Sequence, residues 1–183
     1  MKIDIREKRF GDKIIFKNFS LSVSEGERVL ITGESGRGKT TLLRMMAGLD
    51  RDYEGTIESE KAVMLFQEDR LVENMGVLSN LLLVTDDRKE ALSLLERAGL
   101  KGEENSIVSS LSGGMKRRVS IVRLLLLESD VYLLDEPFSG LDSETKKTVA
   151  AIIRDKTEDK TVVVVSHTDE DADLLGCNQK ITL

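Results

Sequence analysis

Apolar residues along this chain follow two spacings that alternate. Short, nearly continuous apolar runs, typical of strands buried on both faces of a sheet, occupy residues 29–31, 62–66, 131–134 and 162–165. Between these runs, apolar residues recur at helical spacing after Lys39, from about Asp87 to Ala98, and after Ser143. Strands alternating with helices predict an α/β fold with a mostly parallel sheet covered on both faces.

Two segments depart from this alternation. Residues 1–23 alternate apolar and polar positions and lead to a turn at Glu25–Gly26, which predicts an antiparallel β region. Residues from about 68 to 112 have little strand character and predict a helical subdomain. We therefore expect a single domain, in which residues 1–67 and 113–183 form the core around this insertion.

Composition excludes several classes of protein. The chain has 183 residues, 40% hydrophobic and 33% charged, as expected for a globular protein. Its net charge of −6, from 27 basic and 33 acidic side chains, argues against nucleic acid as a partner. A single cysteine, Cys177, excludes an internal disulfide and favours a reducing compartment, with a structural thiol as the simplest interpretation.

The start of the sequence and its short apolar runs suggest a cytoplasmic location. Residues 1–6 alternate polar and apolar positions and lack the apolar core of a signal peptide. The longest apolar runs, at 124–127 and 162–165, are too short to span a bilayer, so a membrane role would require a partner. Sixteen residues follow His167, so we expect no C-terminal regulatory domain.

A glycine-rich loop follows the apolar run at 29–31 and fits the pattern G-x-x-x-x-G-K-[S/T]. It consists of Gly33, Glu34, Ser35, Gly36, Arg37, Gly38, Lys39, Thr40 and Thr41. Its glycines let successive amides point into one concavity at a helix N-terminus, which favours a bound phosphate. Lys39 can reach the outer phosphates, Thr40 can ligate Mg²⁺ and Thr41 an inner phosphate. The alternative is an ordinary glycine-rich turn.

Two acids end the buried run at 131–134. In a phosphate site, the first carboxylate, Asp135, would orient Mg²⁺, and the second, Glu136, would polarise an attacking water. By itself such a pair is usually a solvated loop start. The phosphate loop upstream favours the catalytic interpretation.

A second anion site is predicted at residues 111–115, with sequence Leu-Ser-Gly-Gly-Met. Ser112, Gly113 and Gly114 begin a helix there. With this motif, the whole chain resembles the ATP-binding cassette (ABC) family, whose signature is LSGGQ. In that family two cassettes pair head to tail, and the signature of one closes over ATP held by the other.

The resemblance implies roles for individual residues. Lys39 matches the nucleotide-loop lysine, Thr40 and Asp135 the magnesium partners, and Glu136 the catalytic base. Gln67 matches the glutamine that senses the γ-phosphate and Mg²⁺ and links them to the transport partner. By itself it would be a surface glutamine.

Three further residues match by resemblance. His167, the only histidine, corresponds to the switch histidine at the γ-phosphate, though alone it would suggest a structural residue. Asp142, in the sequence Ser-Gly-Leu-Asp, belongs to the loop that crosses the dimer interface. Phe10 takes the place of the aromatic ring that stacks on adenine, with a core phenylalanine as the alternative.

The chain also departs from the family pattern. Met115 replaces the signature glutamine, Phe10 the more usual tyrosine, and Gly140 a frequent alanine. The first change resembles an importer variant. With residues 66–71 and 135–138, the motifs look like those of the ATPase subunits of bacterial nitrate, sulfonate and taurine importers.

The resemblance implies an enzyme that binds ATP and Mg²⁺, dimerises with a second copy or a paralogous ATPase subunit, and hydrolyses ATP. It would lie at the inner face of the membrane on permease subunits, served by an extracytoplasmic solute-binding protein. The predicted subdomain would contact the permease, although Leu81, Leu82 and Leu83 fit internal packing equally well. The alternatives are a soluble remodelling ATPase and a nucleotide-responsive subunit that rarely hydrolyses ATP.

Overall fold

The computed structural model describes all residues from 1 to 183, and they form two compact units. The first unit consists of Met1–Met64, Ser129–Asp135 and Asp159–Leu183. The second consists of Leu65–Glu128 and Glu136–Glu158. Each unit therefore joins segments that are far apart in the sequence.

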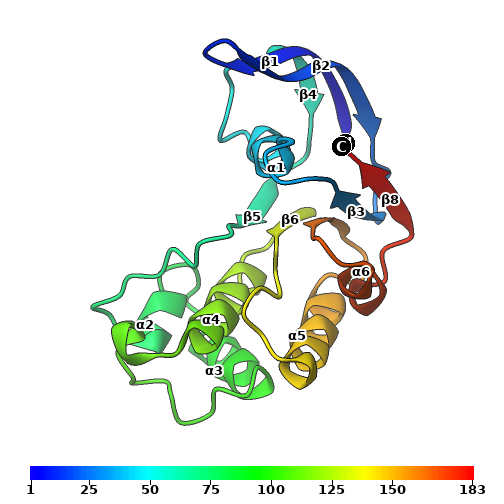
Figure 1. Cartoon of the computed structure of the whole chain (residues 1–183). Helices are drawn as coiled ribbons and strands as arrows, with labels where there is room; N and C mark the ends of the chain where they lie inside the picture. The colour runs from blue at the N-terminus through cyan, green and yellow to red at the C-terminus, as the bar shows by residue number, and fades with distance from the viewer. The chain divides into compact units, whose positions relative to one another are not determined.

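A parallel sheet is the centre of the first unit (Figure 1). Its strands, in spatial order, are β5 (Ala62–Leu65), β6 (Val131–Asp135), β7 (Thr161–Val165), β3 (Arg28–Thr32) and β8 (Gln179–Thr182). Leu133 pairs with Val163, and Ile31 with Val165, in parallel register. Every residue of β6 and β7 is buried, which explains why these strands are continuous apolar runs.

An antiparallel sheet completes the first unit. Its strands, in the order β2-β1-β4, are β2 (Lys13–Ser22), β1 (Lys2–Phe10) and β4 (Glu54–Glu58). Ile3 of β1 pairs with Leu21 of β2 and with Ile57 of β4. The predicted antiparallel region and the turn at Glu25–Gly26 are confirmed.

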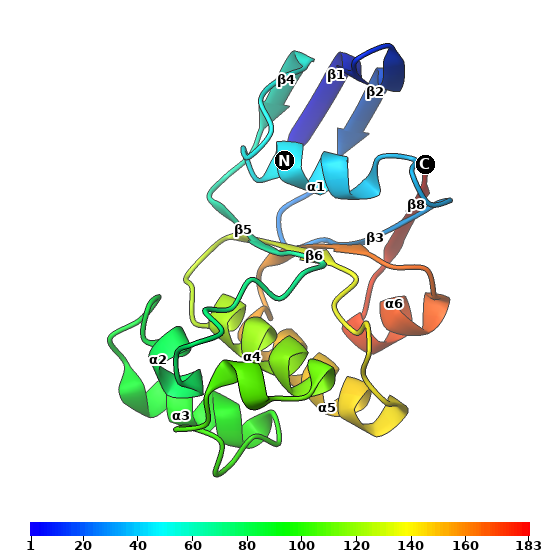
Figure 2. The same cartoon turned by 60° about the vertical axis from the view of Figure 1, so that its left-hand side comes forward.

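Helix α1 (Lys39–Met46) lies between the two sheets (Figure 2). Its apolar side packs into one core with the inner residues of both sheets. The contributing residues of β3, β6 and β7 alternate along each strand, so they share one face of the parallel sheet. They are Val29, Ile31, Val131, Leu133, Val163 and Val165. Helix α6 (Asp169–Leu175) covers the opposite face (Figures 1 and 2).

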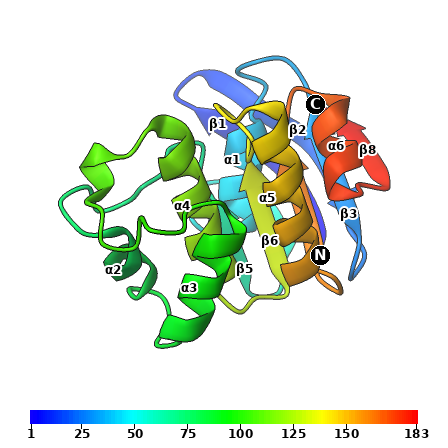
Figure 3. The same cartoon turned by 90° about the horizontal axis from the view of Figure 1, so that it is seen from below.

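The second unit is helical. It contains α2 (Val77–Leu81), α3 (Arg88–Arg97), the 3₁₀ turn η1 (Val108–Ser110), α4 (Gly113–Leu125) and α5 (Ser143–Lys156). Helices α3, α4 and α5 pack against one another (Figure 3). Ion pairs between Arg97 and Asp155, 2.7 Å apart, and between Lys156 and Glu90 link α3 to α5. No helix of the chain is both long and apolar enough to cross a membrane.

Several elements were predicted and others were missed. The helix expected from Asp87 to Ala98 is confirmed as α3, and the Asp87 side chain accepts a hydrogen bond from the Glu90 amide at 2.9 Å. The segment 68–112 contains α2, α3 and η1, while its boundaries as a subdomain stay a prediction. Strands β4 and β8 and helix α6 were missed because few of their residues are apolar and buried.

Candidate functional site

The glycine-rich loop joins the end of β3 to the start of α1. Gly33, Gly36 and Gly38 have φ angles of +145°, +79° and +95°, which residues with a Cβ rarely adopt. A Cβ on Gly38 would lie 2.4 Å from Ile15 Cγ2, and one on Gly33 would lie 2.8 Å from the Leu183 carbonyl oxygen. A Cβ on Gly36 would meet nothing within 4 Å. Close packing as well as backbone conformation therefore favours glycine at positions 33 and 38.

Lys39 lies at the first turn of α1 and closes the loop. Its side chain is 7% exposed, and its ammonium donates to the carbonyls of Gly33 at 2.8 Å and Glu34 at 3.0 Å. An ammonium has three donors, so this arrangement leaves one for a ligand. The first turn of α1 contains no acidic residue, which keeps its amide end positive. The loop and helix together suit a phosphate.

The residues expected to hold Mg²⁺ fit an ion that arrives with a nucleotide. Thr40 lies half-buried in the first turn of α1, and Asp135 is 1% exposed at the end of β6, against which α1 packs. No group of three or more His, Cys, Asp or Glu side chains could hold a metal by itself. One hydroxyl and one carboxylate match Mg²⁺ that keeps its waters and phosphate ligands. Gln67 belongs to the second unit, and its place at this ion stays a prediction.

His167 lies at the same edge of the parallel sheet as the glycine-rich loop. It follows β7, which pairs with β3 through Val165 and Ile31, so both segments leave the carboxyl ends of neighbouring strands. The His167 side chain is exposed. The preceding residue, Ser166, donates its hydroxyl to the Asp171 carboxylate at 2.5 Å. The following residue, Thr168, caps α6. Ligands of parallel sheets usually bind at this edge.

Phe10 is 53% exposed at the end of β1, so the alternative of a core phenylalanine does not apply. The Lys8 ammonium lies 4.5 Å from the centre of its ring. Lys8 is 1% exposed and donates to Asp50 Oδ1 at 2.9 Å and to the Asp52 carbonyl at 2.7 Å. The exposed ring is therefore held from one side by a buried cation.

Glu136 begins the second segment of the second unit and has a φ of +47°. A non-glycine residue in this region costs about 1–3 kcal/mol and persists only where the surroundings hold it. The Glu136 carbonyl accepts from Arg117 Nη2 at 2.8 Å and from the Ser139 amide at 3.2 Å. Hydrogen bonds to its main-chain carbonyl thus hold the strained residue in place. Its side chain is half-buried.

The signature residues begin helix α4. Ser112 caps the helix, its hydroxyl accepting from the Met115 amide at 3.3 Å, and Gly113 and Gly114 form the first turn. A Cβ on Gly114 would lie 3.4 Å from the Gly140 carbonyl oxygen. The signature and the loop containing Gly140 are therefore neighbours.

Asp142 caps α5. Its carboxylate accepts from the Thr145 hydroxyl at 2.6 Å and from the amides of Thr145 and Glu144 at 3.0 and 3.1 Å. The hydrogen bond from the Thr145 hydroxyl, followed by that from the Thr145 amide, lowers the pKa of this carboxyl. The structure thus gives Asp142 a structural role that the sequence analysis did not include.

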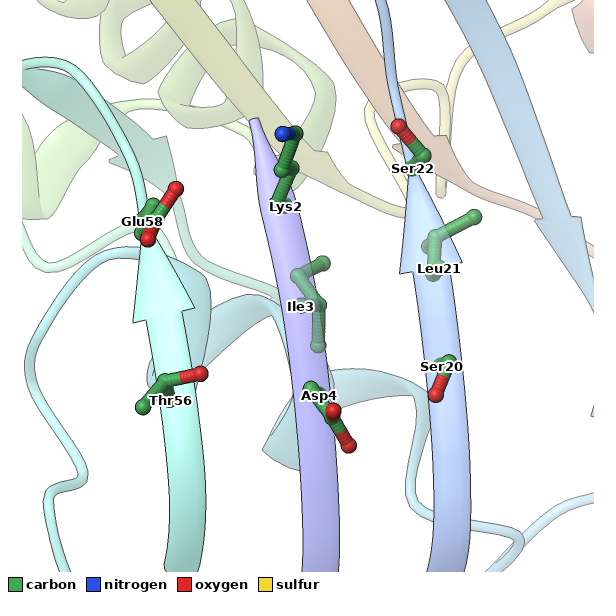
Figure 4. A pocket seen from close by; sticks show the side chains of 8 residues that line it. All are labelled: Lys2, Ile3, Asp4, Ser20, Leu21, Ser22, Thr56 and Glu58. Carbon is green, nitrogen blue, oxygen red and sulfur yellow. The ribbon is translucent and has the colours of Figure 1, made fainter.

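Two concave surfaces lie elsewhere in the first unit. One, of about 470 Å³, lies on the antiparallel sheet and is lined by Lys2, Ile3, Asp4, Ser20, Leu21, Ser22, Thr56 and Glu58 (Figure 4). The other, of about 520 Å³, lies along the end of α1 and β4, and includes Arg51, Tyr53 and Lys61. Neither contains a residue of the glycine-rich loop. The first has the polar side chains expected on the solvent face of an antiparallel sheet.

Comparisons with known proteins decide the family. The family model described as ABC transporter matches residues 16–139, more than half of the chain. The chain belongs to the ABC transporter family. A Rhodococcus jostii relative, aliphatic sulfonates import ATP-binding protein SsuB 1, is 40% identical over 92% of this chain and 73% of its own length. SsuB of Bacillus subtilis is 37% identical over 95% of this chain and 76% of its own length.

Solved structures agree with this assignment. The dimeric, post-hydrolysis structure of the ATP-binding cassette MJ0796 with ADP and Pi is 30% identical, covers 98% of this chain and 91% of its own, and has a TM-score of 0.84. The predicted ABC fold class and family are confirmed. As a member of this family, the chain binds and hydrolyses ATP. The MJ0796 cassette is a dimer in the structure to which the chain is similar.

Proposed function

We propose that this chain powers an importer of a small solute, of the class that includes sulfonates, nitrate and taurine, through separate permease subunits. The names of its relatives support import, since both SsuB proteins are aliphatic sulfonates import ATP-binding proteins. The observation that carries the nucleotide site is the loop from Gly33 to Thr41, with its positive φ angles and its enclosed lysine. An extracytoplasmic solute-binding protein would deliver the solute.

In this proposal the glycine-rich loop and the residues predicted to act with it bind the nucleotide. The loop amides and Lys39 bind the phosphates, Phe10 stacks on adenine, and His167 contacts the γ-phosphate. Thr40 and Asp135, with Gln67, would hold Mg²⁺, which neutralises charge developing on the phosphates.

Residues of the other motifs would complete the reaction. Glu136 accepts a proton from the attacking water, and Gln67 senses the γ-phosphate. Ser112, Gly113, Gly114 and Asp142 act on the nucleotide held by the second copy, or by a paralogous subunit. ATP thus closes the dimer, and hydrolysis lets it reopen.

Replacing Glu136 with glutamine tests the catalytic role. Glu136→Gln keeps the size of the side chain but cannot accept the proton, so we expect ATP turnover to fall by about 10²–10⁴-fold. ATP affinity in calorimetry and ATP-dependent dimerisation in light scattering should remain. The control is Glu58→Gln, a change on the exposed face of β4. Turnover unchanged by Glu136→Gln would remove the residue from its role.

Uptake tests the import role. In the source organism, deletion of the gene should abolish uptake of a radiolabelled alkanesulfonate or taurine, and the wild-type gene should restore it where Glu136→Gln does not. Uptake that persists in the deletion strain, with ATPase activity intact in vitro, would reject this solute class. It would favour the alternative of an ATPase not coupled to import.

A further inference from the structure

Arg117 is a buried arginine on helix α4, five residues after the capping Ser112, and it is 3% exposed. The sequence analysis did not single it out. The spacing of apolar residues nevertheless indicates that Arg117 is buried, because it lies on the same helical face as the buried Ile121 and Leu124. A buried guanidinium requires partners for its donors, and the position of those partners indicates its role.

Arg117 contacts two segments that carry predicted catalytic residues. Its Nη1 donates to the Phe66 carbonyl at 2.7 Å, the Gln67 carbonyl at 3.2 Å and Asp69 Oδ1 at 3.3 Å. On the other side, Nη2 donates to the Glu136 carbonyl at 2.8 Å, and Nε to the Pro137 carbonyl at 3.1 Å. One side chain therefore holds the main chain at both Gln67 and Glu136.

The rest of α4 holds the Gln67 segment in the same way. The Ser120 hydroxyl donates to the Asp69 carbonyl at 2.7 Å, and Arg123 Nη2 donates to the Arg70 carbonyl at 2.8 Å. Arg70 itself has a φ of +47°, and its guanidinium lies 3.5 Å from the centre of the Phe66 ring. Hydrogen bonds from α4, the helix that begins with the signature residues, thus hold the loop at residues 66–70.

The contacts at Glu136 have a specific consequence. Glu136 is held at a positive φ, and its carbonyl receives the Arg117 donor, so loss of that donor frees the main chain at the residue that carries the base. A guanidinium has a planar fork of donors that can serve both segments at once, whereas a lysine ammonium is a compact point charge.

We propose that Arg117 is a positioning residue that fixes Gln67 and Glu136 to each other and to the signature helix. A displacement of α4 then moves the loop at 66–70 and the main chain of Glu136 together. This inference rests on the proposed function, because it gives Arg117 importance only if Glu136 and Gln67 act on the γ-phosphate.

Arg117→Lys tests the proposal, with Arg118→Lys as its matched control. Arg118 is the next residue of the same helix and also donates to main-chain carbonyls. Its partners are Ala98 at 2.8 Å and Gly99 at 3.1 Å, at the end of α3, and Gly114 at 3.3 Å, within α4, and none of them lies in the segments at Gln67 and Glu136. We expect Arg117→Lys to lower kcat by about tenfold or more, because small misplacements of catalytic groups are costly. The Kd for ATP should stay within about twofold, since binding depends on the glycine-rich loop. Arg118→Lys should change neither value.

Hydrogen exchange supplies a readout that does not depend on activity. In Arg117→Lys, amides of residues 66–71 and 136–141 should both exchange faster, while in Arg118→Lys they should not. If Arg117→Lys does not fold, Ser120→Ala is the milder variant. It should speed exchange at 66–71 alone and lower kcat less, because Ser120 contacts Asp69 and not the segment at Glu136.

The outcomes separate the inference from the proposed function. Unchanged kcat in a folded Arg117→Lys, equal loss in Arg118→Lys, or faster exchange at only one of the two segments would overturn the positioning role. A Kd that weakens in parallel with kcat would also overturn it. Full turnover in Glu136→Gln would instead reject the proposed catalytic base, whatever Arg117→Lys does.

Discussion

Gly38→Ala tests how the antiparallel sheet supports the glycine-rich loop. Two costs add at this position. The φ of +95° is unfavourable for a residue with a Cβ, at about 1–2 kcal/mol. The new Cβ would also lie 2.4 Å from Ile15 Cγ2 and 3.0 Å from Phe16 Cζ, and such overpacking costs about 1–3 kcal/mol. We therefore expect a loss of about 2–5 kcal/mol in the free energy of unfolding.

Gly36→Ala is the matched control. Gly36 has a φ of +79°, and a Cβ there would meet nothing within 4 Å, so only the conformational cost of about 1–2 kcal/mol applies. The difference between the two variants isolates the contact between the loop and β2. Adding Ile15→Ala to Gly38→Ala removes Cγ2, so the double variant should lose about 1–3 kcal/mol less than the sum of the single variants.

Urea unfolding followed by circular dichroism measures these differences, because the chain has no tryptophan for a fluorescence signal. At a slope of about 2 kcal/mol/M, Gly38→Ala should lower the midpoint by about 1–2.5 M, roughly twice the shift for Gly36→Ala. ATP binding in calorimetry should be lost in Gly38→Ala. Equal midpoints for the two variants, or no rescue by Ile15→Ala, would refute the proposed contact.

Two further predictions concern buried groups in the first unit. Lys8→Met keeps the apolar stem but removes the ammonium that lies 2.9 Å from Asp50, a residue that is only 17% exposed. We therefore expect the free energy of unfolding in urea to fall by about 3 kcal/mol. The exposed Lys2→Met is the control and should lower it by less than about 0.5 kcal/mol. Equal losses would refute the role of this ion pair. Burial raises the pKa of the Cys177 thiol to about 11, so iodoacetamide should alkylate it slowly at pH 8 and increasingly fast as the pH approaches 11. Because this pKa is raised on folding, the associated stability is present below pH 9 and lost as the pH rises through 11, and rapid alkylation of the native protein at pH 8 would contradict the burial.

The candidate catalytic motifs stand out in the sequence because the chemistry that they predict is local. A glycine loop curls, exposes its amides and starts a helix within nine residues, and the structure places Lys39 inside that curl. Strands β6 and β7 were equally clear, because both faces are buried and every residue is apolar or shielded. Strands β4 and β8 carried no such signal, since partners far away in the chain hold them at the edges of their sheets.

The amino-acid sequence was enough to identify the family and the α/β class and to predict the residues for phosphate chemistry, because these signals depend on neighbours within a few positions. The tertiary structure alone decided which distant groups support them: Ile15 and Phe16 against Gly38, Lys8 beneath the ring of Phe10, and Arg117 between Gln67 and Glu136. The physical reason is that a buried cation or a glycine contact is defined by atoms that the fold brings together, and the spacing of residues along one segment does not encode them.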